Sequence, residues 1–240
     1  MKVKQFEDFK LWVRDEKDWG FWQNDNFEPE ETKLIKSLLK PNWTCLDIGA
    51  NIGYFTILMA KRCRIVRSYE PEACNYQQII KNILLNQTFN IYPSRIALTE
   101  QSGQPLLYLC PTNNGMNRVY PSVLCNGQMI VKTKKLDDIW NELDRFDVHF
   151  IKMDIEGSEL GALRGMTDML LNNHPTILME FHPPSIEESG ASPREIYHLL
   201  KGLGYSIYLI PDTKEEFSYE DLYLQTDDQS GGRNILCLVH

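Results

Sequence analysis

Apolar and polar positions alternate along the chain with two periods, one typical of buried strands and one typical of amphipathic helices. Seven short apolar runs are predicted strands: residues 44–48, 65–70, 91–98, 148–155, 176–181, 205–210 and 235–239. Apolar residues at helical spacing predict helices between them, over residues 30–39, 52–61, 75–86, 135–143, 159–171 and 193–203. This alternation predicts an α/β fold, with a doubly wound, mainly parallel seven-stranded sheet and helices on both of its faces.

Two segments depart from the alternation. Residues 103–133 hold two short apolar runs around a turn-rich stretch, which predicts an inserted β-hairpin of the kind that often shapes a substrate site. Residues 1–40 form an N-terminal extension with aromatic residues among its charges: Phe6, Phe9, Trp12, Trp19, Phe21, Trp22 and Phe27. A disordered tail is poorer in aromatic residues, so we expect the extension to pack on the domain formed by residues 41–240.

The composition is that of an ordinary soluble chain of 240 residues, with 42% hydrophobic and 24% charged residues. The formal net charge of −8 makes nucleic-acid binding unlikely, because short basic runs such as residues 61–67 are most often solvated surface. No run approaches the ~18 apolar residues that cross a bilayer, and residues 1–10 lack the apolar core of a signal peptide. We therefore expect a cytoplasmic protein without membrane insertion.

The six cysteines show no C-x-x-C pair and no spacing to histidine that favours zinc. They are Cys45, Cys63, Cys74, Cys110, Cys125 and Cys237. Several lie inside apolar runs, as buried free thiols do. We interpret them as reduced thiols, in agreement with a reducing compartment.

The first predicted strand breaks into a glycine-containing turn before the next helix. Asp47 lies near the strand end, and Gly49 and Gly53 flank a turn in which backbone without side chains can approach a ligand. Glu70 ends the next strand, where an acidic residue accepts hydrogen bonds from a ribose diol. The spacing is G-x-x-x-G and lacks the middle glycine that admits a pyrophosphate. The pattern therefore favours a nucleoside ligand without phosphates over a dinucleotide.

Later strands also end in titratable residues. Asp154 and Glu156 follow one strand, and Glu180 and His182 end another. Ligands of open α/β sheets bind beyond the carboxyl ends of the strands, so we expect these groups and the glycine turn to share one site. Helix capping is the alternative explanation for acids near residue 159, because carboxylates are stabilised at a helix N-terminus.

These motifs resemble those of class I S-adenosylmethionine-dependent methyltransferases. Residues 46–54 are similar to the first motif of that class, and residues 69–71 to the second. The K-x-D-x-E-G-x-E run of residues 152–159 is more specific: with residues 163–165 it is similar to the signature of FkbM-type methyltransferases. Residues 179–183 resemble the next strand end of that family.

The resemblance implies a Rossmann-like sheet that binds S-adenosylmethionine and transfers its methyl group to oxygen. The residues that would line the methionine part are Asp47, Gly49, Ala50, Asn51 and Gly53. The resemblance places Glu70 on the ribose hydroxyls and Pro71 against the adenosine. Ile96 and Ala97 become adenine contacts, and Asp154 would lie near the reacting methyl group. The acceptor is expected to be a hydroxyl of a small molecule, a glycan or a natural product.

Methyl transfer from a sulfonium is an in-line displacement, which mainly requires collinear reactants in a site with little water. A hydroxyl acceptor must also lose a proton. His182 is the preferred base because its ordinary pKa lies near neutrality, and Asp154 or Glu156 is the second choice. The two prolines after His182 also fit a turn in which its ring only bonds backbone.

Three alternatives remain at this stage. The carboxylates and the histidine at the strand ends could hold a divalent cation, but a cationic cofactor explains them without a metal, and none is expected. The fold could be a catalytically idle binding module whose exposed tryptophans meet a partner. The acceptor could also be the ribose of a nucleic acid. The sequence leaves the oligomeric state open.

Overall fold

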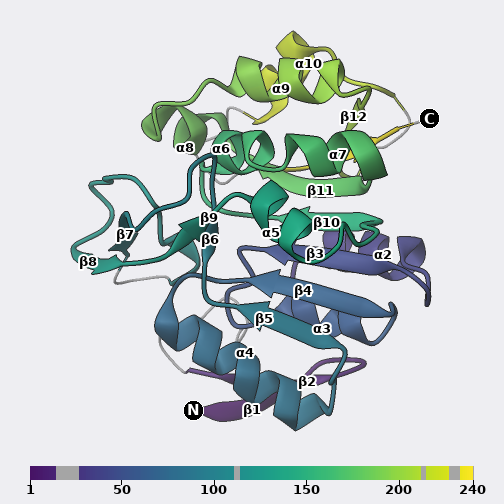
Figure 1. Cartoon of the computed structure of the whole chain (residues 1–240), viewed down its shortest axis with the longest axis vertical. Helices are drawn as coiled ribbons and strands as arrows, with labels where there is room; N and C mark the ends of the chain where they lie inside the picture. The colour runs from purple at the N-terminus through teal and green to yellow at the C-terminus, as the bar shows by residue number, and fades with distance from the viewer. Residues whose placement is uncertain (15–26, 111–113, 212–214, 227–232, 240) are drawn as a thin grey trace.

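The computed structural model describes residues 1–14, 27–110, 114–211, 215–226 and 233–239. Its centre is a seven-stranded sheet in the order β12-β13-β11-β10-β3-β4-β5 (Figure 1). The strands are β3 (Thr44–Ile48), β4 (Ile65–Tyr69), β5 (Ile91–Ser94), β10 (Phe150–Met153), β11 (Thr176–Phe181), β12 (Ser206–Leu209) and β13 (Arg233–Leu238). Neighbouring strands are parallel except at β13, which is antiparallel to both β11 and β12. The predicted mainly parallel seven-stranded sheet is confirmed.

The chain winds in two directions from the middle of this sheet. After β3 it proceeds through β4 to β5, whereas β10 and β11 lie on the other side of β3. The strand order therefore reverses between β3 and β10, which are parallel neighbours. Ligands of open α/β sheets bind at this reversal, beyond the carboxyl ends of the strands.

Side chains alternate between the two faces of the sheet and build two cores. On β3, Leu46 and Ile48 join one core and Cys45 joins the other. The first core is covered by α5 (Leu136–Glu142), α6 (Glu159–Arg164), α7 (Thr167–Asn173), α8 (Pro183–Glu188), α9 (Pro193–Gly202) and α10 (Tyr219–Thr226). The second is covered by α2 (Pro29–Leu38), α3 (Tyr54–Ala60) and α4 (Ala73–Asn86). Helices thus cover both faces, as predicted, and none in the described ranges is long and apolar enough to span a membrane.

The predicted strand over residues 91–98 is two elements. β5 ends at Ser94, and β6 (Ala97–Leu98) pairs with β9 (Thr133–Lys134) in a separate small sheet. The backbone N–H of Ala97 donates to the Lys132 carbonyl at 2.9 Å, so the chain leaves the large sheet for another partner. This break sets the start of the inserted segment beside the carboxyl end of β4.

The predicted helix over residues 159–171 is also divided, into α6 and α7. A side chain at Gly165 would place its Cβ 2.2 Å from the Thr99 carbonyl oxygen, so the chain passes close to another backbone there. The N-terminus of α7 is capped by a side chain from another helix: the Asp137 carboxylate accepts the N–H groups of Asp168 and Met169. α8 and α10 have no counterpart among the predicted helices.

The inserted segment forms the predicted hairpin. β7 (Leu106–Leu109) pairs antiparallel with β8 (Gly127–Ile130), and the short 3₁₀ helix η1 (Asn114–Met116) lies between them. A disulfide joins Cys110 and Cys125, which follow β7 and precede β8. The interpretation of all cysteines as reduced thiols is wrong for this pair, because the hairpin register brings the two together. Cys45, Cys63 and Cys237 are buried free thiols, and Cys74 is exposed.

The N-terminal extension begins with a hairpin of β1 (Lys2–Gln5) and β2 (Lys10–Val13), which lies beside α4 (Figure 1). The rings of Phe6 and Phe9 lie 5.0 and 5.1 Å from the Tyr54 ring. This part of the extension packs on the second core, while Trp19, Phe21 and Trp22 lie outside the described residues. A domain boundary at residue 40 stays a prediction.

One buried side chain connects the hairpin to the glycine turn. Asn82 of α4 accepts the N–H of Trp12 at 2.7 Å and donates to the Ile52 carbonyl at 2.8 Å. Both of its polar groups are satisfied, as buried amides require. The extension therefore supports the turn that follows β3.

Candidate functional site

A cavity of about 270 Å³ opens at the carboxyl ends of β3, β4, β10 and β11. Its size is near the lower end of small-molecule sites. The predicted site residues that line it are Asp47, Gly49, Ala50, Asn51, Glu70, Pro71, Ile96, Ala97, Asp154 and Glu156. Gly53 and His182 are not part of its lining. Most of the residues that were expected to share one site therefore lie around this one cavity.

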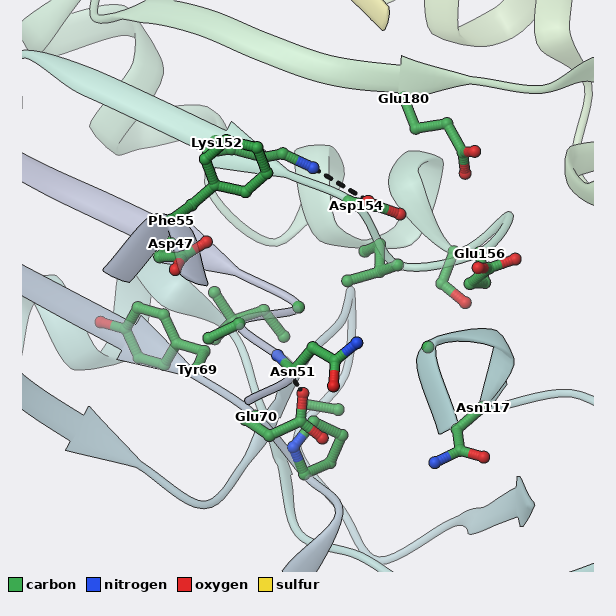
Figure 2. Close-up of a pocket in the computed structure, with 18 of the residues that line it drawn as sticks. Asp47, Asn51, Phe55, Tyr69, Glu70, Asn117, Lys152, Asp154, Glu156 and Glu180 are labelled. Atoms are coloured by element: carbon green, nitrogen blue, oxygen red, sulfur yellow. Dashed lines mark hydrogen bonds and ion pairs between the residues drawn. The ribbon is translucent and has the colours of Figure 1, made fainter. Parts of the chain in front are cut away.

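Strand register explains this convergence. Lys152 lies opposite Asp47 on one side and Leu178 on the other, so the side chains of these three residues share a face of the sheet. Asp154 and Glu180 lie two residues beyond Lys152 and Leu178, just past the end of the pairing between β10 and β11. Figure 2 shows the resulting group of charged side chains around the cavity.

Lys152 is the one cation among the described residues that line the cavity. Its side chain is 3% exposed, its Nζ donates to Asp154 Oδ2 at 2.9 Å, and the Phe55 ring lies 5.1 Å away (Figure 2). Burial alone would lower the pKa of Lys152, but the carboxylates of Asp154 and Glu28 outweigh it and raise the pKa. The amine is therefore charged and holds the Asp154 carboxylate in place.

Six carboxylic acids line the same cavity: Glu28, Asp47, Glu70, Asp154, Glu156 and Glu180. Burial raises the pKa of Asp47 to about 6, although Thr56 donates a hydrogen bond to its carboxylate. Burial likewise raises the pKa values of Glu28, Glu156 and Glu180, and the Asp154 charge adds to the effect. An excess of buried acids over one lysine suits a cationic ligand.

Glu70 is a buried predicted cofactor contact, with 6% exposure. Its Oε2 accepts the N–H of Asn51 at 2.8 Å and its Oε1 accepts the N–H of Glu72 at 2.9 Å (Figure 2). Burial nevertheless raises its pKa to about 8. The Asn75 side chain donates a further hydrogen bond to this carboxylate, which also lines the cavity, where hydroxyl groups of a diol can reach it.

The glycine turn brings three strand ends together. The N–H groups of Gly49 and Ala50 both donate to the Tyr69 carbonyl, at 3.0 and 3.1 Å. A Cβ on Gly49 would lie 1.8 Å from the Asp154 carbonyl oxygen, so only glycine fits between β3 and β10. Gly53, at φ 93°, is the N-cap residue of α3 and does not line the cavity. Its contact with a cofactor stays a prediction.

Some lining residues of the cavity have a strained backbone or an unpaired polar atom. Glu28, Asn51 and Glu156 have φ values of 42°, 50° and 56°, which non-glycine residues rarely adopt. Such conformations cost on the order of 1–3 kcal/mol each and often mark functional sites. Among the described atoms, Asn51 Oδ1 and Glu28 Oε2 are buried without a hydrogen-bond partner. A polar ligand in the cavity would supply those partners.

The inserted segment closes one side of the cavity with Leu107, Gly115, Asn117 and Val119. It is fixed by Arg118, which is 3% exposed and forms ion pairs with Glu156 and Glu188. The Tyr120 hydroxyl donates to the Glu156 carbonyl at 2.6 Å and also contacts the Ser185 carbonyl at 3.0 Å. The segment therefore lines the cavity, and its predicted role in a substrate site stays a prediction.

His182 lies at the start of α8, outside the lining. Its Nδ1 is 2.7 Å from Ser185 Oγ, a hydrogen bond within the first turn of the helix. The ring therefore takes part in a local turn, but through a side-chain hydroxyl and not through backbone alone. The catalytic role of His182 stays a prediction. Over the described part of the chain, no group of three or more His, Cys, Asp or Glu side chains is arranged to hold a metal ion.

Some lining residues are absent from the predicted cofactor contacts and bases. Glu180 was expected at the shared site without a role, and Lys152 lies in the K-x-D-x-E-G-x-E run, where a charged residue inside an apolar strand was the available signal. Glu28 and Phe27 come from the extension, and Asn117 from the insertion. Nothing in the local sequence distinguishes these three, because long-range packing brings them to the cavity.

Comparisons with known proteins agree with this geometry. A family model described as the methyltransferase FkbM domain matches residues 47–207. The hexuronic acid methyltransferase AglP of Haloferax volcanii is 25% identical over 174 residues, which cover 72% of this chain and 67% of that protein.

Two solved structures share the fold. The crystal structure of methyltransferase FkbM from Methylobacillus flagellatus KT has a TM-score of 0.53 at 17% identity, covering 86% of this chain and 50% of that one. The O-methyltransferase from Bacillus cereus in complex with SAH has a TM-score of 0.53 at 13% identity, covering 90% and 83%. The chain thus spans about half the length of the first structure, and the expected Rossmann-like fold is confirmed.

Substituting Gly49→Ala tests the close approach of β3 and β10. The added Cβ would overlap the Asp154 carbonyl, so we expect the free energy of unfolding to fall by about 2 kcal/mol or more. The control is Gly202→Ala, since a Cβ there meets nothing within 4 Å at the end of α9. That variant should be unchanged or more stable by up to about 1 kcal/mol. Urea denaturation that finds both variants equally stable would contradict the geometry.

Proposed function

The chain belongs to the FkbM methyltransferase family, and on this premise we propose that it transfers the methyl group of S-adenosylmethionine to a hydroxyl oxygen of a sugar or another small molecule. Family membership supports the cofactor. The similarity to a protein named hexuronic acid methyltransferase supports a sugar-like acceptor. The observation that carries the proposal is the buried Glu70 carboxylate in a cavity whose described charged lining consists of six acids and one lysine.

The described residues fit S-adenosylmethionine. Glu70 would accept the ribose hydroxyls, since its carboxylate lines the cavity and is held there by hydrogen bonds from Asn51, Glu72 and Asn75. Pro71, Ile96 and Ala97 supply apolar surface for the adenine ring. The unpaired acceptors of Asn51 and Glu28 suit the ammonium group of the methionine part. The six carboxylic acids around the cavity would offset the positive charge of the sulfonium.

When bound, S-adenosylmethionine supplies a methyl group that is activated by the positive charge on sulfur. The role of the chain is to hold the acceptor oxygen in line with the carbon–sulfur bond and to exclude water. Glu28, Asn51 and Glu70 would hold the cofactor, which would supply the methyl carbon to the acceptor oxygen and keep the electron pair of its carbon–sulfur bond. The ion pair with Lys152 would hold the Asp154 carboxylate near the methyl group that is transferred.

We assign the proton of the acceptor hydroxyl to the Glu156 carboxylate. Glu156 lines the cavity, whereas His182 does not. Burial raises the pKa of Glu156 above its ordinary value, which brings it closer to the range of an effective general base at neutral pH. Arg118 and Tyr120 hold the residue from the insertion side, and its strained backbone agrees with a functional position.

Titration calorimetry with S-adenosylmethionine tests the cofactor site. We expect the wild-type protein to bind it and Glu70→Ala to lose at least about tenfold in affinity, because two charge-assisted hydrogen bonds to the ribose are removed. Glu142→Ala is a matched control, since the Glu142 side chain is 60% exposed and pairs with Lys134 away from the cavity. Failure of the wild-type protein to bind the cofactor would rule out the proposed function.

Turnover separates the two candidate bases. Glu156→Gln should lower kcat by about 100-fold or more while S-adenosylmethionine affinity changes little, because the base acts only in the transition state. His182→Gln should keep kcat within about threefold of the wild type. A methyl-labelled cofactor and a hydroxyl acceptor give the measurement. The opposite order of effects would assign the proton to His182.

A further inference from the structure

A second hollow of about 380 Å³ lies beside the cofactor cavity. It is bounded by α6, by the connection between α8 and α9, and by the inserted segment. Val119 and Ser158 line both the hollow and the cavity. The two spaces are therefore neighbours, and these two side chains stand between them.

The wall of the hollow combines open backbone, hydroxyl groups and a small apolar surface. Gly157, Gly161 and Gly190 expose backbone, and Leu160 contributes apolar surface. Ser158 Oγ is buried without a hydrogen-bond partner among the described atoms. Sugar rings present both C–H surface and hydroxyl groups, so they match such a wall.

The charges around the hollow disfavour an anionic acceptor. Arg164 is the one cation of its described lining, and it pairs with Glu195 at 2.9 Å and with Glu100 at 3.5 Å. One cation and two anions leave a net negative charge, and the adjoining cavity adds further carboxylates. A carboxylate on the acceptor would be repelled from this surface.

We propose that this second hollow binds the ring of an uncharged saccharide acceptor, one hydroxyl of which enters the cofactor cavity between Val119 and Ser158. The inference rests on the proposed methyl transfer and names its acceptor site. The hydroxyl oxygen receives the methyl group as the carbon–sulfur bond breaks, and its proton goes to Glu156. Ser158 is a positioning residue that hydrogen-bonds the ring from the boundary between the two spaces.

Gly161 offers a substitution that fills the hollow and spares the cofactor cavity. It lies in α6, and the nearest atom to a Cβ there is the Glu100 nitrogen at 3.8 Å, so a larger side chain can be built into the hollow. Gly161→Phe is the test variant, and Gly161→Leu is the smaller substitution if the first fails to fold. Gly202→Phe is the matched control, because a Cβ at that position contacts nothing within 4 Å.

The experiment is saturation-transfer NMR on the protein saturated with S-adenosylhomocysteine, using methyl α-D-glucopyranoside and D-glucuronate as probes. We expect transfer to the glucoside in the wild type and in Gly202→Phe, and a loss of at least about fivefold in the Gly161 variant. Glucuronate should show a weaker signal than the glucoside. S-adenosylhomocysteine affinity should be equal in all three proteins.

Three results would overturn the acceptor site while leaving the proposed function intact. They are no glucoside signal in the wild type, an equal signal in Gly161→Phe and wild type, and stronger transfer to glucuronate than to the glucoside. Absence of S-adenosylhomocysteine binding by the wild type would instead remove the proposed function, and the acceptor site with it.

Discussion

Burial of several carboxylates around a single lysine is the constraint on which the rest of this structure depends. Moving ionised groups out of water is costly unless each is paired, hydrogen-bonded or protonated. Here Lys152 balances Asp154, two backbone N–H groups hold Glu70, and the remaining acids have raised pKa values. A cationic ligand would complete this balance, so the electrostatics of the cavity favour a ligand with a positive charge.

The surrounding fold provides the geometry for that balance. Parallel register places Asp47 beside Lys152, and the lack of a side chain at Gly49 lets β3 approach the Asp154 carbonyl. Asn82 of α4 connects the N-terminal hairpin to the turn that follows β3. Arg118 holds the inserted segment against the cavity. Elements far apart in the sequence thus build one site at the carboxyl ends of β3 and β10. The neighbouring hollow is the proposed binding site for the saccharide acceptor beside it.

The sequence predicts the centre of this site better than its edges. Asp47, Glu70 and Asp154 each follow an apolar run, so strand prediction alone brings them to one edge of the sheet. Glu28 carries no local signal, because it reaches the cavity only through packing of the extension. His182 satisfies the same local pattern as the lining acids, yet the Ser185 hydroxyl three residues later occupies its ring nitrogen. A hydrogen bond of this kind within one helical turn becomes visible only in the structure.

The most direct test of the electrostatic account is the number of protons exchanged when S-adenosylmethionine binds at pH 7. Calorimetric titration in buffers with different ionisation enthalpies measures this number. Burial raises the pKa of Glu70 to about 8, and an ionised carboxylate is the form that accepts the ribose hydroxyls beside a cation. Binding should therefore release protons, because the ligand stabilises the deprotonated form of Glu70 and of the other cavity acids with raised pKa values. Binding without proton release, or with uptake, would contradict the account.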